Sequence, residues 1–367
     1  NQFLPRMMPL MFGHSRMHGL AINYWCRLVD PKVWGVPRTS EQAAAKINQG
    51  ALKGVKSVGI KREGKYFNVK KVIFDDKEIF SMSNINKMID HVMLSEPPKY
   101  RPYLGMSQIG NPDERMLWLN FRWCLPPNKF EPRVSRILEL GNVIEDVVID
   151  YLKKADGVEV FTEDKKGDQF KASLLGDHFS GHIDGVVKNL PEHDDDSMVL
   201  EVKSSNDRRF NNLVSENSYE RWSLEYEAQV HCYMGAFKLP KSLALVYNKN
   251  NSDIYSEVIK YNDELFQSLI EKAKRIITSP EPPDLFLSEN DWKVKNLPKE
   301  SREVYLGRAE PPFKNCRNCK HSKPIIEVSG ATWRCGKKGV LLNPKQQMDK
   351  KNCPDHELIF GLIPTPF

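Results

Sequence analysis

Two neighbouring segments that alternate apolar and ionisable residues limit the possible folds more than any other part of the chain. Segment 181–187 reads Gly-His-Ile-Asp-Gly-Val-Val, and segment 198–204 reads Met-Val-Leu-Glu-Val-Lys-Ser. Successive side chains of a β-strand point to opposite faces, so we expect Glu201 and Lys203 to share one face. A polar loop of ten residues joins the two segments. The pattern therefore predicts two adjacent strands, with Asp184 beside Glu201 and Lys203.

The rest of the chain predicts an α/β (α+β) fold with a mixed central sheet flanked by helices. Apolar residues recur at helical spacing over 132–154, and shorter runs on either side have strand character. The order helix, strands, helix, strands is typical of this architecture. The expected helices are Asp113–Trp123, Pro132–Lys154, Leu224–Phe237 and Asp263–Ile277, and the expected strands are Val158–Phe161, Phe170–Leu175, Ser180–Val187, Met198–Ser204, Leu243–Tyr247 and Ile254–Tyr261.

Carboxylates and a lysine in this arrangement suit phosphodiester hydrolysis. Carboxylate oxygens are the ligands that Mg²⁺ or Mn²⁺ prefers, and such an ion lowers the pKa of a bound water molecule. A lone Glu-x-Lys pair on a strand is more commonly a solvated ion pair. Two further pairs strengthen the catalytic interpretation, because Gly141 and Glu145 stand one helical turn apart, as do Gln229 and Tyr233.

These residues carry a family resemblance. In their order along the chain, they resemble the RecB-like branch of the PD-(D/E)XK nucleases, which includes CRISPR-associated RecB-like exonucleases and many phage exonucleases. Segment 103–112 and segment 203–210 also look like parts of these proteins. The resemblance covers about residues 100–277. The motifs are Gly141-x-x-x-Glu145, Gly181-x-x-Asp184, Glu201-x-Lys203 and Gln229-x-x-x-Tyr233.

The resemblance implies a restriction-endonuclease-like core and a role for each motif residue. It implies a Mg²⁺- or Mn²⁺-dependent exonuclease that acts on DNA in phage or mobile-element recombination, replication or processing, with phage or host recombination and replication proteins as partners. Asp184, Glu201 and the Val202 carbonyl would bind the metal, Glu145 would be a further carboxylate near it, Lys203 would position the water, and Gln229 and Tyr233 would orient the site.

Two arginines after the second strand are candidates for contacts with the nucleic-acid backbone. Arg208 and Arg209 follow the Glu-x-Lys strand closely, and arginines commonly bind phosphates. An exposed charged loop explains them equally well. His182 shares the alternating face of Asp184, although a lone histidine is more commonly packed or solvated than functional.

Four cysteines cluster near the end of the chain and predict a metal site. Their spacing, C-x₂-C-x₁₅-C-x₁₇-C, suits structural zinc or an iron–sulfur cluster. The CRISPR-associated relatives hold an iron–sulfur cluster and place one of its cysteines ahead of the nuclease core, where Asp113 stands in this chain. This departure from the family pattern favours zinc. The segment is also basic and holds Trp333, a candidate for stacking on nucleic acid. The predicted ligands are Cys316, Cys319, Cys335 and Cys353.

The chain divides into three predicted regions. These are an accessory region of unknown role at 1–97, the nuclease core at 98–285 and the cysteine segment at 286–367. In the accessory region we expect a short helix that begins at Thr39, strands at Val55–Lys61, Tyr66–Phe74 and near Ile79, and a helix at about Asn84–Leu94. No apolar run is long enough to cross a bilayer, and clustered cysteines without a signal peptide favour a cytoplasmic location, that of the host if the chain is phage-encoded. A catalytically idle DNA-binding architectural protein and a metal-dependent ribonuclease remain alternatives.

Overall fold

The structure, a computed structural model, describes residues 58–62, 65–69, 82–94, 99–127, 130–191, 193, 196–348 and 353–364. The chain forms two compact units, 1–85 and 86–367, and each is described by itself. In the first unit, β1 (Val58–Arg62) and β2 (Lys65–Val69) form an antiparallel hairpin, where the sequence predicts two strands. The predicted helix beginning at Thr39 and the predicted strand near Ile79 lie outside the described residues.

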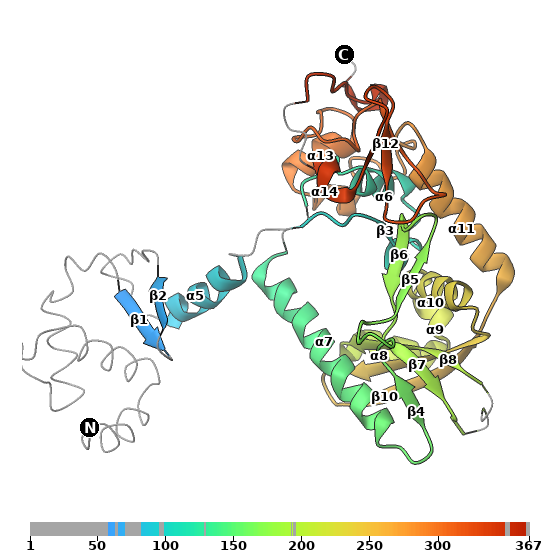
Figure 1. Ribbon diagram of the computed structural model, residues 1–367. Helices are drawn as coiled ribbons and strands as arrows, with labels where there is room; N and C mark the ends of the chain where they lie inside the picture. The colour runs from blue at the N-terminus through green and yellow to red at the C-terminus, as the bar shows by residue number, and fades with distance from the viewer. Residues whose placement is uncertain are drawn as a thin grey trace, which may run out of the picture. The chain divides into compact units, whose positions relative to one another are not determined.

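The centre of the second unit is a mixed five-stranded sheet (Figure 1). β8 runs parallel to β9, and the other neighbouring pairs are antiparallel. The predicted mixed sheet is thereby confirmed. In spatial order the strands are β10 (Ile254–Lys260), β9 (Lys241–Asn248), β8 (Met198–Ser205), β7 (Gly185–Lys188) and β4 (Glu159–Phe161).

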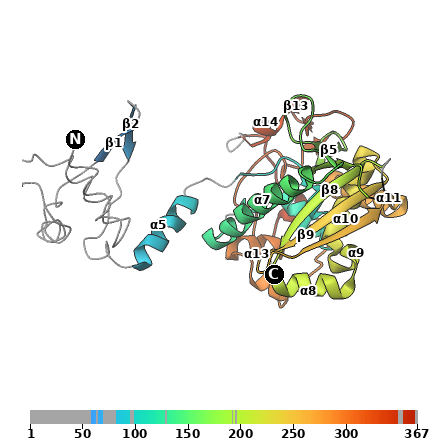
Figure 2. The same cartoon turned by 90° about the horizontal axis from the view of Figure 1, so that it is seen from below.

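Helices cover both faces of this sheet. α7 (Pro132–Lys153) lies on one face, and α10 (Leu224–Phe237) and α11 (Asp263–Thr278) lie on the other (Figures 1 and 2). Leu200 and Val202 of β8 belong to the apolar cluster on the α7 side, whereas the alternate residues of β8 face α10. Burying each large apolar side chain contributes about 1.5–3 kcal/mol to stability. The apolar clusters on the two faces of the sheet therefore hold β8 in place.

The apolar face of α7 is buried only in part, which differs from the predicted core-facing stripe. Ile144 and Val148 are buried, whereas Leu138 and Tyr151 are 49% and 56% exposed. Figure 1 shows that the first half of α7, which includes Leu138, extends beyond the strands of the five-stranded sheet. Helical periodicity identifies which residues share a face, but it does not reveal how far the underlying sheet reaches.

The predicted strand Ser180–Val187 is two strands that belong to different sheets. β6 (Phe179–His182) lies between β3 (Leu104–Gly105) and β5 (Lys171–Leu174) in a three-stranded sheet, and β7 begins at Gly185. At the switch, the Ile183 N–H donates to the Phe170 carbonyl at 3.2 Å. Ile183 is fully buried, so packing holds the chain at this bend.

The C-terminal segment packs onto the same unit through buried arginines. Arg317 is fully buried, with its guanidinium carbon 4.0 Å from the Trp123 ring centroid and 5.1 Å from that of Trp333. Its guanidinium donates to the carbonyls of Pro102 and Phe121 at 2.7 and 2.9 Å. Trp333 is also fully buried, so the prediction that it is available for stacking on nucleic acid is wrong.

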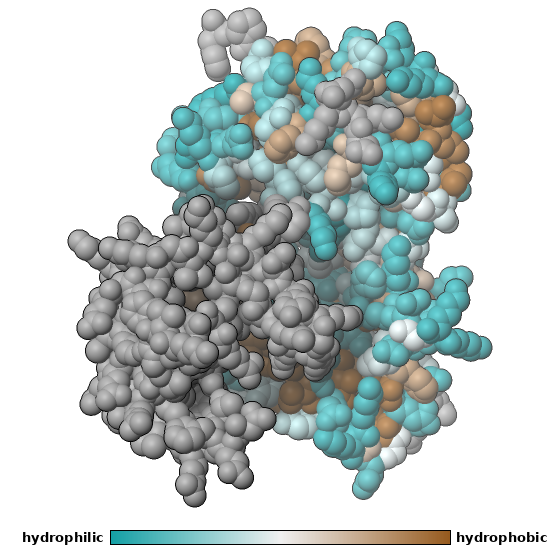
Figure 3. All heavy atoms as spheres, turned by 60° about the vertical axis from the view of Figure 1, so that its left-hand side comes forward, coloured by the Kyte–Doolittle hydropathy of each residue, from teal (hydrophilic) through white to brown (hydrophobic). Residues whose placement is uncertain are grey.

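Most of the remaining elements are short. The helices are α5 (Met82–Leu94), η1 (Met106–Gln108), α6 (Glu114–Phe121), α8 (Asp207–Glu216), α9 (Tyr219–Trp222), α12 (Trp292–Lys295), α13 (Lys299–Tyr305), α14 (Pro344–Met348) and η2 (Phe360–Leu362), and the last sheet holds β11 (Ser322–Pro324), β12 (Trp333–Cys335) and β13 (Val340–Leu342). The face seen in Figure 3 is largely hydrophilic, with smaller hydrophobic patches. Within the described ranges, no helix combines the length and apolar character needed to span a membrane.

Candidate active site

Asp184 lies in the break between β6 and β7, at the edge of β8. Pairing between β7 and β8 begins with Gly185. Beyond that residue β8 has no backbone partner from β7, and the Asp184 side chain takes its place. Its Oδ2 accepts a hydrogen bond from the Val202 N–H at 2.7 Å. The N–H and C=O of one strand residue point to the same side of the strand. The Val202 carbonyl therefore also faces Asp184, which is consistent with its predicted role as a metal ligand.

Glu201 and Lys203 point from β8 toward the α10 side of the sheet. The Lys203 Nζ donates a hydrogen bond to the Glu201 Oε1. The side chain of Glu201 is only 1% exposed, and its Oε2 is buried without a hydrogen-bond partner among the described residues. Leaving a buried charged oxygen unpaired costs on the order of several kcal/mol. The carboxylate thus retains a coordinating atom that no group of the described residues satisfies.

Glu145 approaches Asp184 from α7, on the other side of the sheet. Among the described residues, the ligand atoms of Glu145, Asp184 and Glu201 do not all lie within 4.8 Å of one another, so a bound cation would have to draw them together. Burial, followed by the neighbouring charge of Asp184, raises the pKa of Glu145 to about 7. Burial raises the pKa of Glu201 to about 8, although Lys203 opposes that shift, and burial also raises the pKa of Asp184. Burial would lower the pKa of Lys203, but the Glu201 carboxylate raises it well above its ordinary value. The lysine is therefore charged, whereas the three carboxyl groups lie where ionisation is unfavourable.

The donor set of this cluster fits a divalent cation. When ionised, the three carboxylates carry three negative charges and Lys203 carries one positive charge, so one divalent cation would balance the net charge of −2. The unpaired Glu201 oxygen is the type of ligand that Mg²⁺ and Mn²⁺ prefer. A hollow of about 460 Å³ opens beside Glu145 and Asp184, although Glu201 and Lys203 do not line it.

Gln229 and Tyr233 are both buried in α10 beneath the two sheets. The Gln229 side-chain amide donates to the Tyr233 hydroxyl at 3.1 Å. The Tyr233 ring lies so close to β6 that a Cβ at Gly181 would stand 2.7 Å from its Cε1 atom. This contact explains why residue 181 is glycine, and it links two motifs that lie far apart in the sequence. The pair therefore packs against β6, which precedes Asp184, and lies in the helix that contacts β8, which carries Glu201.

Tyr219 in α9 is a residue of the site that the sequence motifs do not reveal. It is fully buried, and its hydroxyl has no hydrogen-bond partner in the described parts of the chain. Burial raises the pKa of its phenol, and the charge of Lys203 acts in the opposite direction. An unpaired buried hydroxyl costs about 1–3 kcal/mol. Because α9 has only four residues, no periodic pattern indicates which way this tyrosine points.

The predicted accessory residues have different positions. Arg208 and Arg209 are exposed in the first turn of α8, immediately after β8, and the Arg209 guanidinium carbon lies 4.9 Å from the Trp222 ring centroid. His182 is exposed at the end of β6, opposite Lys171. The alternation that would align His182 with Asp184 is interrupted by the break after β6.

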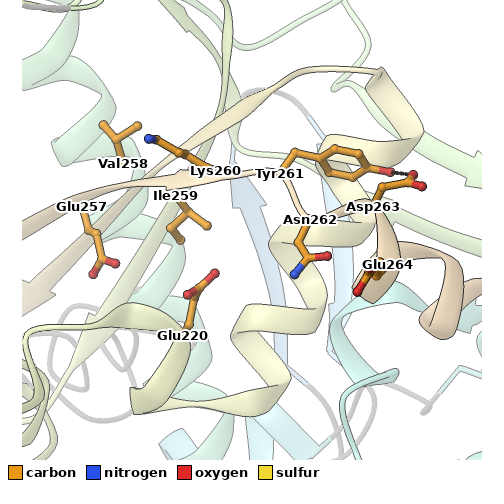
Figure 4. Close-up of a pocket in the computed structure, with 9 residues that line it drawn as sticks. All are labelled: Glu220, Glu257, Val258, Ile259, Lys260, Tyr261, Asn262, Asp263 and Glu264. Atoms are coloured by element: carbon orange, nitrogen blue, oxygen red, sulfur yellow. Dashed lines mark hydrogen bonds between the residues drawn. The ribbon is translucent and has the colours of Figure 1, made fainter.

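A second acidic pocket lies between α9 and β10 (Figure 4). Of the residues that line it, Glu220 also belongs to a cluster with Glu227 and His231, whose ligand atoms lie within 4.8 Å of one another. However, the His231 Nδ1 accepts the Asn262 N–H at 3.3 Å, so a neutral imidazole carries its proton on Nε2 and donates it to the Glu220 Oε1 at 3.2 Å. The nitrogen that would face a metal is thus already protonated. We interpret this cluster as a hydrogen-bonded link between α9 and α10.

The four predicted cysteine ligands lie around the C-terminal sheet but are not assembled into a site. Cys335 pairs with Ser322 between β12 and β11, and Cys319 forms a bridge with Leu358. Tetrahedral zinc would place its sulfur ligands roughly 3.8 Å apart. Among the described residues, no three Cys, His, Asp or Glu ligand atoms of this segment lie within 4.8 Å of one another. The cysteine metal site therefore remains a prediction.

The position where the relatives have their forward cysteine has a structural role in this chain. Asp113 caps α6, because its Oδ1 accepts the Met116 N–H at 2.9 Å. Its Oδ2 accepts a hydrogen bond from the Tyr305 hydroxyl at 2.9 Å. Both carboxylate oxygens are therefore engaged, and the contact with Tyr305 ties α6 to α13.

Comparison with known proteins gives the following matches. No protein-family model matches the sequence, and no match was found among curated proteins. Among solved structures, LHK-Exo in complex with dAMP is 13% identical, over 52% of this chain and 90% of that chain, with a TM-score of 0.36. The alkaline exonuclease LHK-Exo from Laribacter hongkongensis is 12% identical with the same coverage and TM-score, and SSO0001 is 14% identical over 53% of this chain and 85% of that chain, with a TM-score of 0.31. An exonuclease is therefore among the solved structures to which this chain is similar.

Proposed function

We propose that the chain is a divalent-metal-dependent nuclease that hydrolyses phosphodiester bonds in DNA, as an exonuclease in phage or mobile-element recombination, replication or processing. The observation that carries the proposal is the gathering of three carboxyl groups beside one charged lysine: Glu201 is buried, and Glu145 and Asp184 are half-buried. The Glu201 Oε2, which has no partner among the described residues, points to a cation at this position. The order of the motifs along the sequence supports a nuclease in particular.

Each residue of the cluster has a distinct role in this proposal. Asp184, Glu201 and the Val202 carbonyl would hold Mg²⁺ or Mn²⁺, with Glu145 as an additional carboxylate. When bound, the cation neutralises charge on the phosphate and lowers the pKa of water. Lys203 remains protonated, so it acts as a hydrogen-bond donor that positions the attacking water and the phosphate rather than as a base. Attack of water on phosphorus breaks one ester bond and leaves one phosphate end and one hydroxyl end.

The class of substrate is tested with matched nucleic acids. We expect the full chain to degrade end-labelled linear DNA in Mg²⁺ and to spare covalently closed circular DNA of the same sequence. If the circular DNA were cleaved as fast as the linear DNA, the chain would be an endonuclease and not an exonuclease. Faster cleavage of RNA than of DNA of the same sequence would favour the ribonuclease alternative. DNA that is bound but never cleaved in Mg²⁺ or Mn²⁺ would favour an architectural role.

Stability should depend on pH and on the cation together. The pKa values of Glu145 and Glu201 rise from the ordinary value of 4.5 to about 7 and about 8. Because both values are raised, their contribution to stability is fully present below pH 4.5 and is lost as the pH rises through about 7 to 8. A cation that binds the ionised carboxylates restores that stability. We expect Mg²⁺ to raise the melting temperature more at pH 8.5 than at pH 6.0, as measured by differential scanning calorimetry.

Glu201→Gln provides the control for this measurement, because the substitution removes the charge while it retains an acceptor for Lys203. This variant should show a smaller Mg²⁺-induced increase at pH 8.5. An equal increase at both pH values in the unmodified chain would show that the cation does not bind at these carboxylates.

The cysteine segment is tested separately. If the four thiols close around zinc, elemental analysis of the purified chain should find about one zinc per chain and no iron. Cys335→Ala should lose the metal, whereas Cys232→Ala, in α10, should retain it. Iron with acid-labile sulfide would assign an iron–sulfur cluster. The absence of bound metal in anaerobically purified protein would contradict the metal site.

A further inference from the structure

Three aromatic side chains form a continuous cluster beside the catalytic lysine. Tyr219 and Tyr226 are stacked, with ring centroids 6.0 Å apart and an interplanar angle of 26°. Trp222 packs against both, at 5.9 Å from Tyr219 and 5.3 Å from Tyr226. Tyr219 is fully buried and anchors the cluster, whereas the other two rings are half-buried and reach the surface. Leu224, which lies between them in the sequence, is 67% exposed.

This cluster adjoins the carboxylate site directly. The Lys203 Nζ lies 5.4 Å from the centroid of the Tyr226 ring. On the same rings, the Arg209 guanidinium carbon lies 4.9 Å from the centroid of Trp222 and 5.7 Å from that of Tyr226. Two cations therefore lie beside two half-exposed aromatic rings, and one of them is the lysine that we expect to meet the phosphate.

The polar atom of the indole is already satisfied within the protein. The Trp222 Nε1–H donates to the Arg209 carbonyl at 2.9 Å, which fixes the orientation of the ring. The exposed part of Trp222 is consequently a rigid apolar surface. Planar rings next to a guanidinium are the elements with which proteins stack the bases of single-stranded nucleic acids, because every base has an aromatic face.

We propose that Trp222, Tyr226 and Arg209 form a nucleobase-binding subsite, which stacks one unpaired base of the strand whose phosphate meets Lys203. In a duplex, neighbouring bases cover both faces of each base, so only a single strand or a frayed end can fill this subsite. The inference rests on the proposed nuclease function and extends it to the class of substrate, a strand with an unpaired base next to the cleavage point.

Binding in EDTA tests the subsite without requiring cleavage. The probe is a fluorescein-labelled single-stranded DNA of twelve nucleotides, and a series of probes has one abasic nucleotide at each successive position. For the unmodified chain, fluorescence anisotropy should show roughly 5- to 150-fold weaker binding when the abasic nucleotide occupies one particular position. Trp222→Ala should weaken binding of the intact probe to a similar extent, and Trp222→Phe should largely restore it.

The decisive comparison combines the protein and probe changes. In Trp222→Ala, moving the abasic nucleotide along the probe should make no further difference, because the stacking partner is already missing. Trp292→Ala removes a tryptophan that is 67% exposed in α12, and it should respond to the abasic series as the unmodified chain does. An unmodified chain that binds every abasic probe as tightly as the intact one would overturn the subsite. A position-dependent loss that persists unchanged in Trp222→Ala would also overturn it.

These outcomes are separate from those of the nuclease proposal. A chain that shows the abasic effect but never cleaves DNA in Mg²⁺ retains the base-binding subsite and loses the proposed catalytic function. A chain that cleaves DNA but shows no abasic effect retains the catalytic function and loses the subsite.

Discussion

Asp184→Asn and Glu201→Gln should each reduce DNA cleavage by roughly a thousandfold or more, while the chain remains folded. The expected loss corresponds to several kcal/mol of transition-state stabilisation that the cation supplies. Both substitutions keep the shape of the side chain. The new amide oxygen at position 184 would still accept a hydrogen bond from the Val202 N–H, and the one at position 201 would still accept one from Lys203. The rate of release of an end label, measured with saturating Mg²⁺, tests this expectation.

An exposed aspartate provides the matched control. Asp168 lies in the turn before β5 and is exposed, so Asp168→Asn should cleave at the unmodified rate. Melting temperatures measured in EDTA should be the same or higher for Asp184→Asn and Glu201→Gln, because each variant removes one charge from a buried cluster. Cleavage by Asp184→Asn within about tenfold of the unmodified rate would remove Asp184 from the metal site.

Lys203→Ala should reduce cleavage by roughly 10²- to 10³-fold, because a pre-positioned donor beside the reacting phosphate is lost. Binding of DNA should weaken far less, since Lys203 contributes one of several positive charges near the strand. Single-turnover rates at saturating protein separate the two effects. Lys203→Arg should recover only part of the rate, because guanidinium retains the charge but places its donors differently.

The exposed lysine at the end of β7 is the control for this experiment. Lys188 lies over the Phe161 ring at 5.7 Å and is exposed, so Lys188→Ala should retain full activity. If Lys203→Ala cleaved at the unmodified rate, Lys203 would serve only as a structural partner of Glu201, and the catalytic interpretation of the Glu-x-Lys motif would be wrong.

The sequence predicts most strands and helices of the second unit, because strand alternation and helical spacing are local properties of the chain. The strand at 198–205 and the helix Leu224–Phe237 are found where the sequence predicts them. The break at Asp184 was not predictable in the same way. The alternation continues through the break, where Ile183 is buried and its N–H donates to the Phe170 carbonyl as the chain changes sheets. That change places Asp184 at the edge of β8.

Tertiary contacts decide the parts of the site that the motifs do not contain. Tyr219 and Trp222 belong to a helix of four residues, and their relation to Lys203 depends on how α9 packs against α10. Trp333 looks like a surface residue because its segment is basic, yet it is buried between Arg122 and Arg317, whose guanidinium carbons lie 4.8 and 5.1 Å from its ring centroid. Sequence composition does not identify which arginines turn inward to pack on aromatic rings.

In the proposed function, the cluster of Glu145, Asp184, Glu201 and Lys203 hydrolyses DNA with a divalent cation. The most direct test follows end-labelled linear DNA in parallel reactions of the unmodified chain in Mg²⁺, the same chain in EDTA, and Asp184→Asn in Mg²⁺. We predict label release in the first reaction alone, and its return when excess Mg²⁺ is added to the EDTA reaction. Equal label release in Mg²⁺ and in EDTA, or from the unmodified chain and Asp184→Asn, would contradict the claim.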